Sequence, residues 1–247
     1  MRLLIDIGNS RIKWALGAAG ELSVPAGFAR PRADHDDAWE RAWGQLTPEG
    51  VVVCSVAGRR SVAVLRDWVE RRWAVPFHEI RAREYCGPIV NAYADPASLG
   101  ADRWANLLGA RAALGPLDCI IVDAGTAVTV DALRADGRHL GGAIFAGLSA
   151  SRAGLRSAAP ALPAAHDEAP LPSDNTAGAI GGGTLIGLAG AIERVAMVVG
   201  GRLTAPERIL TGGDAERLAP WLDAGWSSDP LLTLRGLLHG GDAACAG

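Results

Sequence analysis

The residues of this chain best suited to chemistry are acidic and hydroxyl side chains arranged around glycine turns. Asp6, Gly8 and Ser10 directly follow an apolar run near the start of the chain. The same order of residue types recurs in DAGTA at 123–127. A carboxylate at the end of a strand can hold Mg²⁺, directly or through water, and the backbone N–H groups of a glycine turn can surround a phosphate. The repetition predicts two related halves that face one cleft.

A second candidate group is the segment GADR at 100–103. Pro96 and Gly100 mark a loop, and the apolar spacing that follows predicts a helix from 101 or 102. Asp102 would then lie in the first helical turn, as a candidate base. Acidic residues also favour helix N-termini because they complement the dipole, and that explanation stays open. Arg103 is equally explained as a solvated helix residue, and Tyr93 as simple packing.

Two further positions are candidates for a binding site. A glycine pair follows Thr211 at the end of a predicted strand, where a base or ribose could lie against the backbone. A tight strand–helix turn explains the same residues. Thr176 begins a long apolar helix, where it or Asn175 would serve as the N-terminal cap.

Composition narrows the classes of function. The 247 residues carry a net charge of −3, which gives no electrostatic case for binding nucleic acid or an anionic membrane. Lys13 is the only lysine, and no Gly-Lys-Ser/Thr triplet of a P-loop exists. The start of the chain lacks a signal-peptide pattern, and the apolar segment 183–201 is interrupted by charges, which favours a core helix over a membrane span. We therefore expect a soluble, cytoplasmic protein.

The cysteines and histidines show no ligand spacing. The four cysteines are scattered and form no C-x-x-C pair, which favours reduced thiols over a disulfide framework or a zinc site. The five histidines have no spacing typical of metal ligands. No Ser-His-Asp or Cys-His arrangement stands out.

The helices and strands that must position these residues are predicted from apolar periodicity and from turn residues such as Gly and Pro. Alternation of strands and helices after an opening hairpin predicts an α/β protein with mixed sheets. We expect two half-domains, residues 1–115 and residues 116–247. An Ala- and Pro-rich stretch, 158–175, has no periodicity and is predicted to be an exposed connector. Strands are predicted at 3–7, 11–16, 51–56, 76–80, 119–122, 139–145 and 207–210. One more is predicted within 17–31, and another in the run that follows Thr126 and continues through Asp131. Helices are predicted at 36–46, 59–73, from 101 or 102, 149–156, 176–199, 214–222 and 230–238.

The order of motifs, DIGNS, then DAGTA, then TGG at 211–213, resembles the superfamily of acetate and sugar kinases, actin and heat-shock ATPases. In that superfamily two ribonuclease-H-like halves clamp ATP. GADR between the two hairpins narrows the match. In length and motif order the whole chain resembles the type III pantothenate kinases, a family that includes the Bvg accessory factors.

The resemblance implies a reaction and its partners. ATP would phosphorylate pantothenate to 4′-phosphopantothenate, the first step of coenzyme A biosynthesis. The implied cofactors are Mg²⁺ and a monovalent cation, K⁺ or NH₄⁺. The resemblance also implies a homodimer whose substrate site is completed at the subunit interface.

The resemblance assigns roles residue by residue. Asp102 would be the catalytic base, Asp123 the K⁺ ligand and Asp6 the Mg²⁺ ligand. Pantothenate would contact Tyr93, Gly100, Ala101, Asp102, Arg103 and Thr176. ATP would contact Asp6, Ile7, Gly8, Asn9, Ser10, Arg11, Ile12, Lys13 and Thr126.

One departure and two alternatives remain. Ala146 stands where the family commonly has proline before a glycine, which is expected to loosen the turn at Gly147. A regulatory or non-catalytic nucleotide-binding protein could use the same fold, and so could a phosphatase or another sugar-type kinase. An intact GADR argues against a degenerate site.

Overall fold

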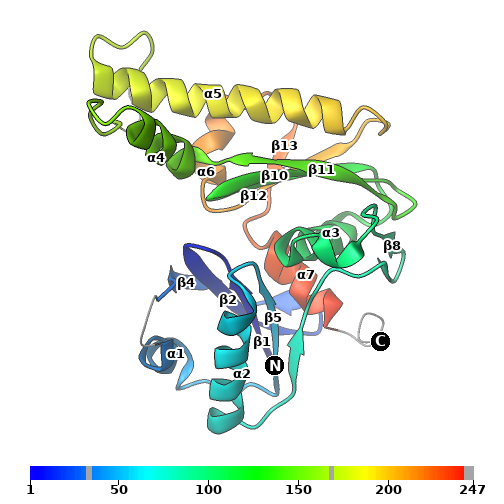
Figure 1. The fold of residues 1–247 in the computed structure, drawn as a ribbon. Helices are drawn as coiled ribbons and strands as arrows, with labels where there is room; N and C mark the ends of the chain where they lie inside the picture. Colours follow the sequence, from blue (N-terminus) through cyan, green and yellow to red (C-terminus); the bar gives the residue numbers. More distant parts are fainter. Residues whose placement is uncertain (32–34, 167–169, 242–247) are drawn as a thin grey trace. The chain divides into compact units, whose positions relative to one another are not determined.

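The computed structural model describes residues 1–31, 35–166 and 170–241. Within these residues the chain forms two compact units (Figure 1). Unit 1 comprises residues 1–116, 136–138 and the described residues from 231 onward, and unit 2 comprises 117–135 and 139–230. This division differs from the predicted halves at the C-terminus, because the last helix packs on elements of unit 1.

Unit 1 is built on a mixed sheet with the strand order β3-β2-β1-β5-β6, and β4 also pairs with β2. β1 and β2 are antiparallel, whereas β1 pairs with β5 and β5 with β6 in parallel. The strands are β1 (Arg2–Ile7), β2 (Arg11–Ala18), β3 (Glu21–Leu22), β4 (Ala26–Ala29), β5 (Gly50–Ser55) and β6 (Phe77–Glu79).

The two faces of this sheet are covered by different helices. α1 (His35–Trp43) and α2 (Arg59–Arg72) place Trp39, Trp43 and Trp68 in one cluster with the alternate strand residues Leu3 and Ile5. The opposite face carries Leu4 and Val52 and is covered by α7 (Leu232–Gly240) together with α3 (Ala101–Leu114). The helices and strands predicted for this half are all present.

A short antiparallel ribbon leads into the segment before α3. It consists of β7 (Tyr85–Cys86) and β8 (Ile89–Val90), followed by the 3₁₀ helix η1 (Pro96–Ser98). The turn 136–138 belongs to the same unit and holds this ribbon, since Val90 N–H donates to Gly137 O at 3.0 Å. Gly137 has φ +91° and lies so close to Pro88 O that a Cβ there would overlap it. The ribbon was not predicted, because strands of two residues show no periodicity.

Unit 2 repeats the strand order of unit 1. Its sheet runs β11-β10-β9-β12-β13, with β9–β10 and β10–β11 antiparallel and β9–β12 and β12–β13 parallel. Both sheets therefore place a first strand between an antiparallel hairpin partner and a parallel neighbour. The strands are β9 (Cys119–Ala124), β10 (Ala127–Leu133), β11 (His139–Ala146), β12 (Glu207–Thr211) and β13 (Trp226–Ser228).

The core of unit 2 lies between this sheet and its helices, α4 (Leu148–Ala158), α5 (Thr176–Val199) and α6 (Ala215–Leu218). Leu185, Leu188 and Ile192 of α5 pack with Val128 and Val130 of β10. Among the described residues α5 is the one helix with the length and apolar composition of a membrane span, and 33% of its most apolar window is buried. Its packing on the sheet agrees with the predicted core helix.

Two sequence predictions need correction. The helix predicted at 214–222 is divided into α6 and the 3₁₀ helix η2 (Ala219–Trp221), because Pro220 provides no N–H for a continuing α-helix. Cys86 is disulfide-bonded, so the prediction of reduced thiols is wrong there, whereas Cys54 and Cys119 are free and buried. Cys245 lies outside the described residues, as do residues 167–169 of the predicted connector.

A carboxylate joins three loops at one end of the sheet in unit 2. Asp118 Oδ1 accepts from the backbone N–H of Ala135 at 2.6 Å, and its Oδ2 accepts from that of Thr204 at 2.7 Å. These two hydrogen bonds lower the pKa of Asp118 below its ordinary value. Asp118 therefore fixes where β9 begins.

The α3–α7 pair in unit 1 is held at backbone contact by glycines. A Cβ on Gly236 would overlap Ala105 O, and one on Gly109 would overlap Leu232 O. Thr233 Oγ1 donates to Asn106 Oδ1 at 2.8 Å in the same buried interface. Only glycine permits this approach, since any side chain would push the helices apart.

We expect Gly236→Ala to lower the free energy of unfolding by about 2 kcal/mol, because α7 must shift away from α3. Thermal denaturation should show a Tm that falls by about 5 °C. Gly154→Ala on α4 is the control, since a Cβ there meets nothing within 4 Å, and its Tm should not fall. Equal melting of Gly236→Ala and the parent protein would show that the helices do not need this contact.

Candidate functional site

The first strand-end turn lies in unit 1 between β1 and β2. Asp6 is paired with Lys13 of β2 and with Cys54 of β5, which places these three side chains on one face of the sheet. Cys54 Sγ donates to Asp6 Oδ1 at 3.5 Å. The turn is closed by Gly8 N–H, which donates to Arg11 O at 3.0 Å. A carboxylate, an ammonium group and a turn with exposed residues therefore adjoin one another.

The second turn has the same construction in unit 2. Asp123 lies near the end of β9 and is paired with Thr129 of β10 and Thr211 of β12. Gly125 N–H donates to Ala127 O at 3.0 Å and closes the turn, which leaves Thr126 exposed. The positions beside the carboxylate are occupied by hydroxyl residues here, where unit 1 has Lys13 and Cys54.

Two glycines pack directly onto this second turn. A Cβ on Gly147 would overlap Gly125 O, and Gly147 N–H donates to Thr126 O at 3.0 Å. Gly212 has φ +103°, and a Cβ on it would overlap Ala124 O. The turn at Gly147 is therefore hydrogen-bonded to the second hairpin although Ala146 precedes it. The predicted nucleoside turn 211–213 lies against the same hairpin.

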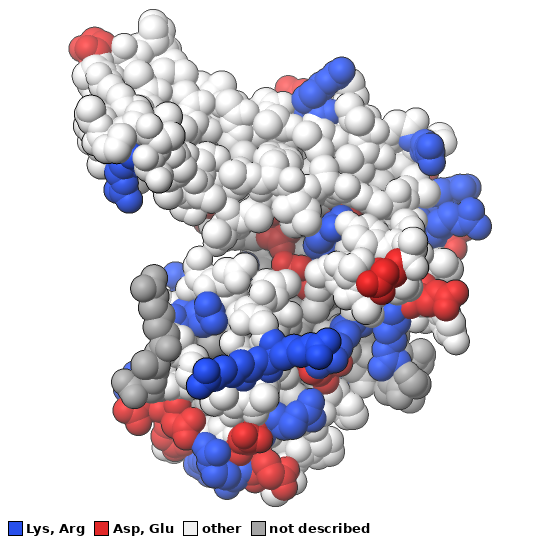
Figure 2. All heavy atoms as spheres, in the orientation of Figure 1, with Lys and Arg blue, Asp and Glu red and all other residues white. Residues whose placement is uncertain are grey.

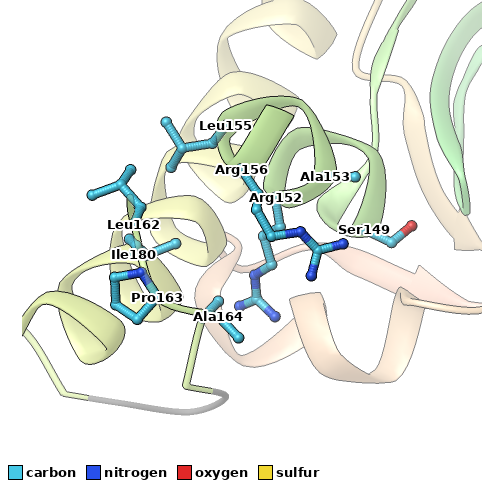
Figure 3. A pocket seen from close by; sticks show the side chains of 10 residues that line it. Ser149, Arg152, Ala153, Leu155, Arg156, Leu162, Pro163, Ala164 and Ile180 are labelled. Carbon is cyan, nitrogen blue, oxygen red and sulfur yellow. The ribbon is translucent and has the colours of Figure 1, made fainter. Parts of the chain in front are cut away.

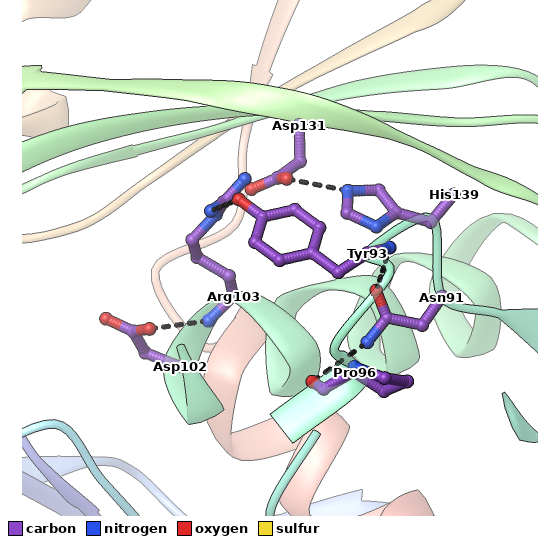
Figure 4. A network of polar contacts seen from close by, with 7 residues as sticks. All are labelled: Asn91, Tyr93, Pro96, Asp102, Arg103, Asp131 and His139. Atoms are coloured by element: carbon purple, nitrogen blue, oxygen red, sulfur yellow. Dashed lines mark hydrogen bonds and ion pairs between the residues drawn. The ribbon is translucent and has the colours of Figure 1, made fainter. Parts of the chain in front are cut away.

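The predicted substrate residues 100–103 lie at the start of α3. Figure 4 shows two of them, Asp102 and Arg103, with Tyr93 beside Arg103. Asp102 Oδ1 accepts from Arg103 N–H at 2.7 Å, and a Cβ on Gly100 would lie 2.7 Å from this oxygen. Arg103 is 3% exposed, and its Nη1 donates to Tyr93 Oη at 2.6 Å. The guanidinium carbon also lies 5.5 Å from the centre of the Tyr93 ring. The Asp102 carboxylate is thus held by the backbone N–H of its neighbour, and the buried Arg103 guanidinium is held by Tyr93.

Thr176 is the first residue of α5, as predicted, and its side chain is exposed. The cap is Asn175, whose Oδ1 accepts from Gly178 N–H at 2.9 Å. Arg152 of α4 donates from Nε to Thr184 Oγ1 at 2.9 Å and from Nη2 to Gly181 O at 3.1 Å. These bonds tie α4 to the first turns of α5.

A cavity of about 220 Å³ lies in unit 2 beside these bonds (Figure 3). It is bordered by α4, by the segment 162–165 and by Ile180 of α5. Arg152 and Arg156 are its charged side chains, and the other lining residues are small or apolar, apart from Ser149. None of these lining residues was predicted from the sequence to be a site residue.

A buried acid–imidazole pair is a further feature missed by sequence reasoning. His139 Nε2 and Asp131 Oδ1 are 2.8 Å apart, and both residues are at most 2% exposed (Figure 4). They lie on the neighbouring strands β11 and β10 of unit 2. The period-2 pattern placed Asp131 in a strand, but no spacing linked it to His139.

The two implied cations can be compared with the side chains present. Among the described residues no group of three or more His, Cys, Asp and Glu side chains could hold a metal ion. Mg²⁺ often binds one or two carboxylates together with water and substrate phosphates, which fits Asp6 beside a phosphate-type turn. A monovalent cation with oxygen ligands fits Asp123, whose neighbours Thr129 and Thr211 are hydroxyl residues.

The predicted site residues are divided between the units. Unit 1 carries Asp6–Lys13, Tyr93 and Gly100–Arg103, and unit 2 carries Asp123, Thr126 and Thr176. Within unit 1 the structure joins Tyr93, Asp102 and Arg103 by hydrogen bonds. Sequence reasoning missed Cys54 and Asn91, which bond to predicted site residues; a lone cysteine in a strand and a lone asparagine before a loop carry no motif.

Comparison with known proteins identifies the family. The family model described as type III pantothenate kinase matches residues 2–197. A type III pantothenate kinase of Halorhodospira halophila is 38% identical, over 97% of this chain and 97% of that relative.

Solved structures agree in fold. A Campylobacter jejuni protein described as a conserved Baf family transcriptional activator superposes with a TM-score of 0.62 at 22% identity, covering 95% of this chain and 94% of that one. The activator of 2-hydroxyisocaproyl-CoA dehydratase from Clostridium difficile, with bound ADPNP, superposes at 0.53 and 15% identity, covering 96% and 91%. The repeated strand order and these neighbours confirm the predicted α/β fold with mixed sheets. The chain belongs to the type III pantothenate kinase family.

Proposed function

We propose that this chain transfers the γ-phosphoryl group of ATP to the primary hydroxyl of pantothenate, with Asp102 as the base that accepts the hydroxyl proton. Family membership makes the chain an ATP-dependent pantothenate kinase. The observation that supports the residue assignment is the hydrogen-bonded group of Asp102, Arg103 and Tyr93 at the start of α3. Phosphoryl transfer needs mainly positioning and charge stabilisation, and such a rigid group provides both.

Each end of pantothenate has a partner of suitable chemistry in this group. The buried guanidinium of Arg103 suits the substrate carboxylate, because Arg–carboxylate pairs are strong and oriented. The Asp102 carboxylate would face the hydroxyl at the other end. Tyr93 supports Arg103 through its hydroxyl and ring.

The ATP phosphates would lie along the turns of β1–β2 and β9–β10. Residues 6–13 and Thr126 surround these turns. Asp6 would hold Mg²⁺ and Asp123 the K⁺ or NH₄⁺ ion, and both cations would offset phosphate charge. Lys13, paired with Asp6, adds a further positive charge on the same face.

We place the protein in the cytoplasm as a homodimer with Thr176 contacting pantothenate at the interface. Exposed apolar residues of α5 support this arrangement: Met197 is 62% exposed and Val198 66%, and Ile186 is also exposed. Figure 2 shows that the drawn face over α4 and α5 is largely uncharged, whereas charges of both signs are interspersed over α1 and α2. An uncharged apolar face of this kind is typical of a subunit interface.

Asp102→Asn is expected to lower kcat by about 10²- to 10⁴-fold, because the amide cannot accept the proton from the hydroxyl. ATP affinity, measured by nucleotide titration, should stay at the parental value. The assay is ADP release with and without pantothenate. Near-parental turnover would show that another group is the base, and pantothenate-independent ADP release would favour the regulatory alternative.

Replacing K⁺ with Na⁺ in the assay is expected to lower the rate of ADP release. Asp123→Asn should have a low rate in both salts, because its amide attracts a cation less strongly than the carboxylate does. The parental protein and Asp123→Asn are both assayed at constant ionic strength. A parental rate that is the same in both salts would remove the role given to Asp123.

Light scattering is expected to give a mass about twice the chain mass of 25.5 kDa. Ile186→Glu should shift the protein toward the monomer and raise the KM for pantothenate, because it places charge in the apolar face of α5. Val24→Glu, in an 88% exposed position of unit 1, is the matched control and should leave the mass unchanged. A monomeric parent protein with full activity would contradict the shared site.

A further inference from the structure

The segment between the β7–β8 ribbon and α3 is organised around one buried side chain, Asn91. Asn91 is 8% exposed. Its Nδ2 donates to Arg83 O at 3.1 Å and to Pro96 O at 3.2 Å, and its Oδ1 accepts from Tyr93 N–H at 3.0 Å. Its own backbone N–H donates to Glu84 O at 2.8 Å. One amide side chain therefore joins the chain before the ribbon, Tyr93 and the start of η1 (Figure 4).

The bonds of Asn91 lead directly to the substrate residues. Asn91 fixes the backbone of Tyr93, and Tyr93 Oη accepts from Arg103 Nη1 at 2.6 Å. Arg103 N–H in turn donates to Asp102 Oδ1 at 2.7 Å. The ribbon on the other side of Asn91 is held by the bond from Val90 N–H to Gly137 O. Asn91 thus lies between an anchored ribbon and the side chains that face the substrate.

We propose that Asn91 is a positioning residue that sets the pantothenate affinity by holding Tyr93, and through it Arg103, in place. This inference rests on the proposed function for what Tyr93 and Arg103 bind. Asn91 does not touch the reacting atoms. It supplies two donors and one acceptor at fixed angles, a set that no other side chain of its size offers.

A simpler account is that Asn91 only satisfies buried backbone groups, as most buried polar side chains do. Both accounts predict some loss of stability on substitution, because Arg83 O and Pro96 O would lose their donor. They differ in kinetics. If Asn91 is a positioning residue, its substitution should raise the KM for pantothenate more than the KM for ATP. This rise should depend on the Tyr93 hydroxyl.

The test compares the kinetics of Asn91→Ala, Asn91→Asp, Tyr93→Phe and the double variant Asn91→Ala/Tyr93→Phe with the parental enzyme. Asn91→Ala should raise the KM for pantothenate by about 10-fold or more, with a smaller change in the KM for ATP. Asn91→Asp keeps the acceptor for Tyr93 N–H and loses both donors, so its KM should be intermediate. In the double variant the two effects should combine to less than their product, because both substitutions break one chain of contacts.

Thr233→Val is the matched control for stability. It removes another buried hydrogen bond of unit 1, the one to Asn106 Oδ1 in the α3–α7 interface. Thr233→Val keeps the glycine contacts of Gly109 and Gly236 that hold α3 against α7. At a similar fall in Tm it should therefore leave the KM for pantothenate near the parental value. Equal rises in both KM values, multiplicative effects in the double variant, or the same KM rise in Thr233→Val would each overturn the positioning role.

Hydrogen exchange without substrate provides a readout independent of activity. The amides of residues 93–99 should exchange faster in Asn91→Ala than in the parental protein, and those in Thr233→Val should not. Unchanged exchange at 93–99 would overturn the inference even if pantothenate is a substrate. A parental protein that fails to phosphorylate pantothenate would instead overturn the proposed function, and the exchange result would still decide the role of Asn91.

Discussion

The contact between the backbones of α3 and α7 is the constraint on which the position of α3, and of the substrate residues proposed at its start, depends. Gly109 and Gly236 remove the side chains that would separate the helices. α3 is therefore fixed along its length, and its first turn presents Asp102 and Arg103 from a rigid support. The role of base proposed for Asp102 would depend on such support, since displacement of a catalytic group by about 1 Å can cost 10²-fold in rate.

The two halves show how one fold gives two equivalent carboxylates different surroundings. Asp6 and Asp123 occupy equivalent places near the ends of the first strands, and each faces one antiparallel and one parallel neighbour. The neighbours of Asp6 are Lys13 and Cys54, so an ammonium group already lies on that face. The neighbours of Asp123 are threonines, which offer oxygen atoms and no charge. The different roles proposed for the two carboxylates follow from these neighbours.

The strand pattern, the turn glycines and GADR were sufficient to predict most elements, both hairpins and the residues around Asp102. The return of α7 to unit 1 could not be predicted, because it depends on glycines, which leave no hydrophobic periodicity. The role of Asn91 could not be predicted, because it lies in hydrogen bonds to three backbone groups that no sequence motif marks. The prediction of a reduced thiol was wrong for Cys86, because a disulfide depends on proximity in space, which sequence spacing does not reveal.

The placement of α7 also has a consequence for the order in which the protein is made. A ribosome completes the β1–β5 region and α3 long before it reaches residues 232–240. Until then one face of the first sheet lacks the helix that covers it, and α3 lacks its partner. Domains usually fold as they emerge, but unit 1 is completed only when residues 232–240 have emerged. Until that point the apolar surface that α7 covers in unit 1 stays exposed on the nascent chain.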